Sequence, residues 1–322
     1  MRKVTFVLIG FLFFSLSLQG AHSRGRSFIF QQTVEIYNLR DGSKDLRVWI
    51  PYPAQSPWQE IEEVEIISSL DTEIIQEKRY GNKILYLYSP DFKGEKLEIN
   101  LKFKIKRSEY DFYKKADKNK KNLFRFLRPS STVPVNGSMR KLAKSIVKDK
   151  KSQREQIKAL YDYLIAEFDY SKEDLQICGI GNSLLTLKHK KGNCSDYHSV
   201  FLSLARSLKI PAKFEIGYPL NSKTKGEIGG YHCWTKYYEK GKGWFGLDIS
   251  EADKHPEKGD YFFGRLDENR VLFVTGRDIN LPFAKDKESM PLNFFIYPYA
   301  EIDGEQFFNV KWQVYYSQNK PL

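Results

Sequence analysis

The spacing of hydrophobic residues changes at about residue 138 of this 322-residue chain, and that change limits the folds open to it. Before this point the period is two. The longest run places apolar side chains at Leu97, Ile99, Leu101, Phe103 and Ile105, with polar or charged residues between them. This alternation is typical of an antiparallel strand with one buried face. Several such segments over residues 27–107 predict a β-sandwich.

From residue 138 onward the pattern is helical and then strand-like. One helix is indicated by Ile157, Leu160, Tyr161, Leu164 and Phe168. A second helix should begin at Cys194 and end near Lys209-Ile210-Pro211. Strand-like segments follow at 212–218, 231–238 and 243–249, and the tail predicts a hairpin at 294–302 and 306–315. Helices followed by strands predict an α+β fold.

These patterns predict a domain order. Residues 24–107 should form an N-terminal β-sandwich-like domain, and residues 138–322 the α+β domain. Residues 108–137 are rich in lysine and contain Pro129 and Pro134, which indicates a linker or long surface loop.

Residues 1–23 read as a secretory signal peptide. Arg2-Lys3 precedes an apolar stretch from Val4 to Leu18, and Ala21-His22-Ser23 fits a cleavage site of small residues. A membrane anchor is the alternative, but the apolar stretch is short for a span of about 20 residues. We therefore expect an exported protein, periplasmic or extracellular.

The net charge of +12 fits peripheral attraction to anionic envelope surfaces, or solubility alone. The sequence contains no nucleic-acid-binding motif.

Three cysteines in an oxidising compartment allow at most one disulfide. A Cys178–Cys233 bond would leave Cys194 free, and three free thiols are equally compatible with the sequence. The cysteine and histidine spacings do not resemble a zinc site, and we expect no metal or other cofactor.

Cys194 is a candidate nucleophile. It follows Gly192-Asn193 at the predicted start of a helix, where unpaired N–H groups and a partial positive charge favour a thiolate. A buried cysteine that packs as a small hydrophobic residue is the alternative.

His232 and Asp248 lie on two predicted neighbouring strands, sixteen residues apart, which allows them to face each other. The histidine could act as a base and the aspartate could orient it. His198 is a competing base one helical turn after Cys194, and we expect it to be structural. Asp248 alone could equally be an ordinary strand-end residue.

The segments around these residues resemble the bacterial transglutaminase-like family of papain-type cysteine enzymes. The likeness rests on Gly192-Asn193-Cys194-Ser195-Asp196-Tyr197-His198, on Gly230-Tyr231-His232-Cys233-Trp234 and on Gly243-Trp244-Phe245-Gly246-Leu247-Asp248. It extends over roughly residues 140 to 300. The resemblance implies a papain-like core, with the nucleophile helix packed on an antiparallel sheet.

The resemblance also implies roles for these residues. Cys194 would be the nucleophile, His232 the base and then the acid, and Asp248 the orienting carboxylate. Candidate oxyanion donors are the Cys194 N–H and the Tyr170 hydroxyl. Arg270 or Arg277 could bind a substrate carboxylate, although an ion pair within the fold is the more frequent use of such residues.

Three functions are compatible with these features. The favoured one is hydrolysis of peptide or isopeptide amides, in an envelope peptide or protein, through a thioester acyl-enzyme. The second is amide transfer to an amine, as in a protein cross-linker. The third is a catalytically silent binding module that keeps the fold. The oligomeric state is not predicted.

Overall fold

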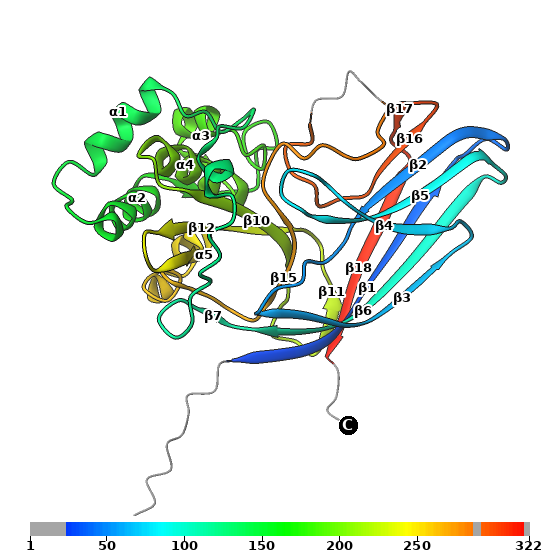
Figure 1. Cartoon of the computed structure of the whole chain (residues 1–322), viewed down its shortest axis with the longest axis horizontal. Helices are drawn as coiled ribbons and strands as arrows, with labels where there is room; N and C mark the ends of the chain where they lie inside the picture. Colours follow the sequence, from blue (N-terminus) through cyan, green and yellow to red (C-terminus); the bar gives the residue numbers. More distant parts are fainter. Residues whose placement is uncertain (1–23, 286–290, 319–322) are drawn as a thin grey trace, which may run out of the picture.

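The computed structural model describes residues 24–285 and 291–318, so the proposed signal peptide lies outside the described residues. The molecule has a helical part packed beside a β-sandwich, with a smaller sheet between them (Figure 1). This arrangement confirms the predicted α+β fold with a sandwich near the N-terminus. Among the described residues, no helix is both long and apolar enough to cross a bilayer.

Two five-stranded antiparallel sheets form the sandwich. The first has the strand order β11 (Lys225–Glu227), β18 (Val310–Gln318), β1 (Gly25–Tyr37), β6 (Lys96–Ser108) and β3 (Gln59–Ser68). The second has the order β17 (Glu305–Phe307), β16 (Tyr299–Ile302), β2 (Ser43–Pro51), β5 (Lys83–Phe92) and β4 (Thr72–Gln76).

Strand β6 confirms the predicted alternation. Its buried face carries the five apolar residues of the period-two run, while Lys102 and Lys104 pair with glutamates of β3 on the outer face. The same parity continues to Arg107, which is buried although it is charged. A charged side chain therefore occupies a position where this strand otherwise places core residues.

The tail strands complete the sandwich rather than the second domain to which they were assigned. The hairpin is shorter than predicted, with β16 paired to β17 around Asp303-Gly304. Strand β18 then runs antiparallel along β1 and buries Val314 and Tyr316. Pairing with β1 satisfies the backbone of an otherwise open sheet edge. The boundaries predicted at residues 107 and 137 remain predictions, but the sandwich needs both ends of the chain.

Residues 108–137 are more ordered than a linker. Strand β7 (Tyr110–Asp111) pairs with β14 (Arg265–Leu266), and the 3₁₀ helix η1 (Leu123–Leu127) buries Phe126. The backbone N–H of Trp244 donates to Asp117 O at 2.8 Å. This segment therefore packs along the smaller sheet.

The central helix of the helical part is α4 (Cys194–Ser207). It begins at the predicted residue, and all of its residues are buried. The other helices of this part are α1 (Gly137–Ile146), α2 (Gln153–Glu167), α3 (Ser183–His189), α5 (Ile249–Lys254) and the 3₁₀ helix η2 (Pro256–Lys258). Strands β8 (Asp169–Tyr170) and β9 (Lys191–Gly192) form a short parallel pair just before α4.

The smaller sheet has the order β13 (Gly243–Leu247), β12 (His232–Glu239), β10 (Ala212–Pro219) and β15 (Arg270–Thr275). Helix α4 packs on one face of this sheet, mainly against β12 and β10 (Figure 1). The other face is turned toward the sandwich, where the Lys236 ammonium of β12 lies 6.0 Å from the centre of the Trp58 ring, and Gln59 of β3 bonds the backbone of Leu272 at the β15 edge. Each face of β12 therefore has its own surroundings.

Candidate active site

Local capping fixes the position of Cys194. The Asn193 side chain accepts a hydrogen bond from Ser195 N, and the Asp196 carboxylate accepts one from Asn193 N, so the two form a capping box. Asp196 also accepts from the N–H groups of Gly179 and Gly181. Gly192 is needed here, because a Cβ would lie 2.5 Å from Asp196 Cβ. Cys194 is thus held as the first residue of α4.

His232 and Asp248 meet across two adjacent elements. The His232 Nε2 atom lies 2.7 Å from Asp248 Oδ2. Because this nitrogen faces the carboxylate, Nδ1 is the ring nitrogen left for the thiol, and Cys194 is one of the neighbours that raise the pKa of His232. The three residues predicted from the sequence are therefore brought together, and all three are buried.

Asp248 lies after the end of β13 and not within it. It is the N-cap of α5, where its Oδ1 accepts hydrogen bonds from Glu251 N and Ser250 Oγ. Its Oδ2 accepts from His232 and, at 2.7 Å, from Arg270 Nη1. Burial raises the pKa of Asp248, but His232 and Arg270 outweigh it and hold the pKa well below the ordinary value. The carboxylate stays ionised.

The thiol and imidazole form an ion pair at neutral pH. A hydrogen bond from Cys233 is the largest effect on the pKa of Cys194; burial opposes it, His232 adds to it, and the pKa falls well below the ordinary thiol value. Burial lowers the pKa of His232, but Asp248 and then Cys194 overcome it and raise the pKa to about 10. A thiolate beside an imidazolium is the reactive form of a cysteine nucleophile.

His198 is structural, as its position on α4 suggests. It is fully buried, and burial lowers its pKa to about 4, so the ring is neutral at pH 7. Its Nε2 accepts a hydrogen bond from Ile249 N at 3.1 Å. The ring proton is therefore on Nδ1, which lies 3.6 Å from Cys233 Sγ. His198 thus holds Cys233 and the backbone next to Asp248.

Cys233 is the site residue that the sequence interpretation missed. All three cysteines are free, so the Cys178–Cys233 bond considered above is not formed. Burial, followed by Cys194, raises the pKa of Cys233 well above its ordinary value, so Cys233 remains a thiol at neutral pH. Strand alternation contained the signal, because the residue after His232 must face α4.

The other candidate residues occupy different places. Burial, followed by the charge of Cys194, raises the pKa of Tyr170, so this neighbour of the nucleophile keeps its phenolic proton. Arg270 is 2% exposed and bonds Asp248 and Asp267. Arg277 is fully buried and bonds Asn293, Ser199 and Gly181 O. Both arginines are thus engaged within the fold.

A small hollow of about 240 Å³ is lined in part by the residues that precede His232 in the chain. Its lining includes Gly229, Gly230, Tyr297 and Trp312. Burial, followed by the charge of Cys194, raises the pKa of Tyr297. Tyr231 links this hollow to the start of α4, because its ring packs on Tyr297 and its hydroxyl lies 3.2 Å from Ser195 Oγ.

A search of the described ranges, 24–285 and 291–318, finds no group of three or more histidine, cysteine or acidic residues that could hold a metal ion.

The family model described as the transglutaminase-like superfamily matches residues 140–249. This chain has a transglutaminase-like core. The match begins in α1, includes all three residues of the triad and ends just after Asp248.

Similar proteins extend the likeness beyond the core. An uncharacterized protein of Haemophilus influenzae is 23% identical over 320 residues, covering 86% of this chain and 86% of that protein. The uncharacterized protein YebA of Bacillus subtilis is 24% identical over 206 residues, which are 60% of this chain and 26% of YebA. A crystal structure from Cytophaga hutchinsonii, described as a candidate cysteine protease, superposes with a TM-score of 0.59. It is 17% identical and 91% of each chain is covered, so the two proteins share an overall fold.

Proposed function

We propose that this protein is an exported cysteine hydrolase that cleaves peptide or isopeptide amides through a thioester acyl-enzyme. The observation that carries the proposal is the triad geometry. His232 lies 2.7 Å from an ionised Asp248, and its pKa is raised in part by Cys194, which is held at the start of a buried helix. This arrangement supplies a nucleophile, a proton carrier and a fixed counter-charge.

The first half-reaction forms the thioester. The Cys194 thiolate attacks the amide carbonyl carbon, and the C–N bond breaks as His232 gives its Nδ1 proton to the leaving amine. The developing oxyanion needs donors. The Cys194 N–H at the start of α4 and the Tyr170 hydroxyl are the candidates. Asp248 stabilises the imidazolium before the proton leaves.

The second half-reaction releases the acyl group. His232, now neutral, takes a proton from water, and the resulting hydroxide attacks the thioester carbonyl. The C–S bond breaks, Cys194 leaves as a thiolate, and the imidazolium is restored. If a primary amine replaces water, the same steps transfer the acyl group. The hollow lined by Tyr297 and Trp312 would accept an apolar or aromatic substrate side chain beside the scissile bond.

The first experiment measures thiol reactivity without a substrate. Iodoacetamide should alkylate Cys194 rapidly at neutral pH, with Cys178 as an internal reference because it is also buried and free. The His232→Ala variant should lose the fast rate. Equal rates for Cys194 and Cys178, unaffected by His232→Ala, would favour the silent binding module.

The second experiment identifies the acceptor. Peptide amides and isopeptides are incubated with the protein, with and without a labelled primary amine, and analysed by mass spectrometry. Hydrolysis predicts free acid product, an acyl adduct on Cys194 and little labelled amide. Cys194→Ala should be inactive, and the matched Cys178→Ala variant should be active. Dominant labelled amide would instead identify an amine transferase.

Export is tested separately. The mature N-terminus of the protein, measured by mass spectrometry of the envelope and culture fractions, should lie near Arg24. Recovery of the intact chain from the cytoplasm would contradict export and leave the proposed chemistry unaffected.

A further inference from the structure

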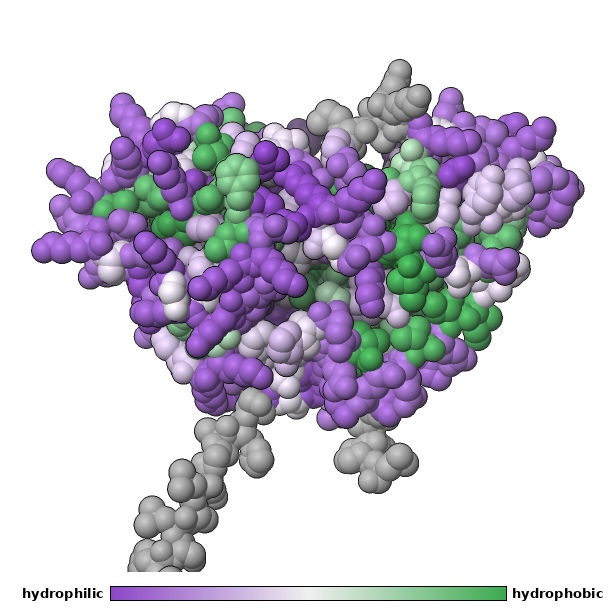
Figure 2. Space-filling view, in the orientation of Figure 1, coloured by the Kyte–Doolittle hydropathy of each residue, from purple (hydrophilic) through white to green (hydrophobic). Residues whose placement is uncertain are grey.

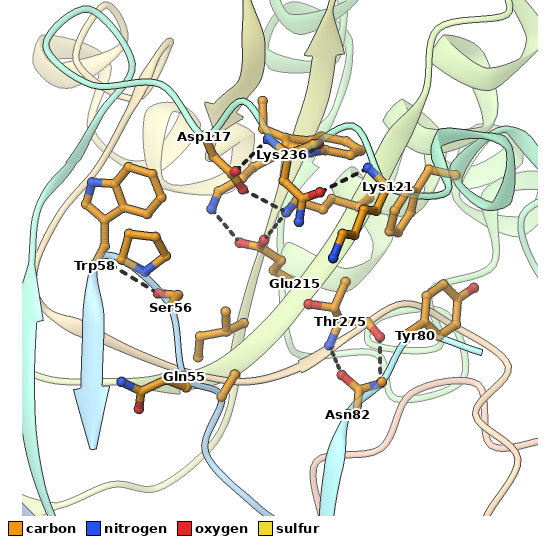
Figure 3. A pocket seen from close by; sticks show the side chains of 18 of the residues that line it. Gln55, Ser56, Trp58, Tyr80, Asn82, Asp117, Lys121, Glu215, Lys236 and Thr275 are labelled. Atoms are coloured by element: carbon orange, nitrogen blue, oxygen red, sulfur yellow. Dashed lines mark hydrogen bonds and ion pairs between the residues drawn. The ribbon is translucent and has the colours of Figure 1, made fainter. Parts of the chain in front are cut away.

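A second cavity lies on the face of the smaller sheet opposite to α4. Its volume is about 690 Å³, within the usual range for ligand sites. The wall is built from β10, β12 and β15, from the sandwich, and from residues 117–126. In Figure 3, Lys236 and Glu215 lie near the middle of the view, between Trp58 on one side and Tyr80 with Asn82 on the other. None of the triad residues lines it.

The cavity contains more positive than negative charge. Two carboxylates line it, Asp117 and Glu215, against six cationic side chains: Lys83, Arg107, Lys121, Arg125, Lys213 and Lys236. Glu215 is 2% exposed and is ionised, because two lysines and Trp234 together outweigh its burial and lower its pKa to about 2.

The two carboxylates already interact with lysines of the cavity wall. Glu215 pairs with Lys213 and Lys236, each at 3.1 Å, and accepts from Trp234 Nε1 at 2.6 Å. Asp117 lies 3.9 Å from Lys213. Within the described part of the chain, Lys83, Arg107, Lys121 and Arg125 pair with no carboxylate.

Among these four cations, Arg107 gives the strongest argument for a ligand because it is buried. It is 4% exposed, and its Nη1 donates to Trp58 O at 3.1 Å. Its Nε has no partner among the described residues. Burial lowers its pKa only to about 10, so the guanidinium is charged at neutral pH. The charges of Glu215, Asp267 and Glu268 offset part of this cost, but none of them forms an ion pair with Arg107 among the described residues. A buried charge that lacks a directly paired counter-charge is costly, and a bound anion would reduce that cost.

Aromatic side chains complete the wall. Trp58, Tyr80, Phe126 and Trp244 line the cavity together with the cations. Lys213 lies 4.5 Å from the centre of the Trp244 ring, so part of this aromatic surface already stabilises positive charge. The remaining rings provide apolar contact for the body of a ligand whose charged groups meet the cations.

We propose that this cavity binds a small polyanion, carrying carboxylate or phosphate groups, at a site separate from the triad. Arg107 donates to the anion from the closed end, and Lys121 and Arg125 contact it from the more open side. Binding neutralises the cations that have no partner. It also fixes residues 117–126 against the smaller sheet.

Calorimetric titration of the full mature protein tests the site, with citrate and pyrophosphate as the two probes and NaCl matched for ionic strength. Saturable 1:1 binding is expected for at least one probe. Binding of citrate alone assigns carboxylates, binding of pyrophosphate alone assigns phosphates, and both results support the site. No saturable binding of either probe overturns the proposal.

Two variants locate the binding. Arg107→Gln should weaken the affinity for the probe at least tenfold. Circular dichroism of this variant checks that it is folded, so that the loss can be assigned to the site. The double variant Lys121→Gln with Arg125→Gln changes partly exposed residues, so it should fold normally and also lose at least tenfold. Lys102→Gln is the matched control, because it lies on β6 as Arg107 does but on the outer face. Equal affinities in all three proteins would overturn the assignment.

Cys194→Ala separates this proposal from the catalytic one. It should bind the probe as the parent protein does. Calorimetry therefore tests the anion site, whereas thiol reactivity and turnover test the triad.

Discussion

Two regions along strand β12 differ in how their buried charges are paired. At the candidate triad each charge has a partner: Asp248 is bonded by His232 and Arg270, and Arg270 also pairs with Asp267. Farther along the strand, around Lys236, Glu215 is paired, but Arg107 and the cations near it are not. Trp234 separates the two regions, since its indole N–H bonds Glu215 while its ring lies beside His232 and Arg270.

The comparison distinguishes a site prepared for a reaction from one prepared for a ligand. Fixed, complementary charges stabilise a changing charge distribution without reorganisation, which suits catalysis. An unbalanced charge is reduced when a counter-ion arrives, which suits binding. The outer surface differs again: Figure 2 shows hydrophobic residues exposed over the sandwich, where Ile67 of β3 is 58% exposed.

The largest expected effect compares the two buried carboxylates. Asp248→Asn should lower kcat by about 10²- to 10⁴-fold, because the amide no longer stabilises the imidazolium. Glu215→Gln should lower it less than about tenfold, since Glu215 touches no reacting group. Steady-state kinetics on the hydrolysed amide measures both. Similar losses in kcat for the two variants would mean that the region around Asp248 and the region around Glu215 do not act independently.

Arg270 is expected to have the next largest effect, as a residue that positions Asp248. Arg270→Gln should reduce kcat by about 10- to 100-fold with little change in KM, as for other groups that orient a catalytic side chain. Arg270→Lys should recover part of the loss, because the positive charge remains. An effect on KM alone would instead indicate the substrate contact considered from the sequence.

The pH dependence of Cys194 alkylation tests the ion pair. The pKa of Cys194 is well below its ordinary value and that of His232 is raised to about 10, so the rate should change little between pH 6 and 9. In His232→Ala the thiolate is less stabilised, and the rate at pH 6 should be at least about tenfold lower than in the parent protein. A parent rate that rises steadily toward pH 9 would contradict the ion pair.

The same shifts predict the pH dependence of stability. The pKa of His232 is higher in the folded than in the unfolded protein, so its contribution is complete below pH 6.5 and is lost as the pH rises through about 10. Asp248 has a lowered pKa, so its contribution is present above pH 3.8 and is lost as the pH falls below this value. Denaturant unfolding of the parent and Asp248→Asn proteins across pH measures the difference.

The smallest expected effect concerns the close backbone contact between β10 and β15. Gly217 pairs with His232 at an irregularity between β10 and β15, and a Cβ there would lie 1.6 Å from Val271 O. Gly217→Ala should reduce the free energy of unfolding by about 2–3 kcal/mol, since the strands must move apart. Gly229→Ala is the matched control, because its Cβ would meet no atom within 4 Å. Equal stabilities would show that the strands adjust freely.

Much of the site could be predicted because its signals are local. The start of α4 follows from Asn193 and Asp196, whose spacing is that of a capping pair, and the three proposed triad residues lie within residues 140–249, which the family model matches. The position of Asp248 as a helix cap was also visible in its spacing to Glu251 but was interpreted as a strand end. Local hydrogen bonds of this kind depend on a few neighbouring residues.

Other features depend on residues far apart in the chain. The tail hairpin was predicted without partners for its strands, because β-strand propensity does not specify which edge a strand will join; in the structure the tail strands pair with β1 and β2 of the sandwich. The contact of Cys233 with His198 and Cys194 joins β12 to α4. Arg107 illustrates both cases: its place on the buried face of β6 follows from alternation, but its lack of a counter-charge does not.

The sequence by itself determined the two hydrophobic periods and the helix that begins at Cys194, and it singled out the three residues proposed as the triad. Only the tertiary structure decided that both chain ends complete the sandwich, that Arg270 holds Asp248, and that a cation-rich cavity lies behind the catalytic sheet. The reason is physical. Periodicity and capping arise from neighbouring residues, whereas the partner of a buried charge is set by every element that packs around it.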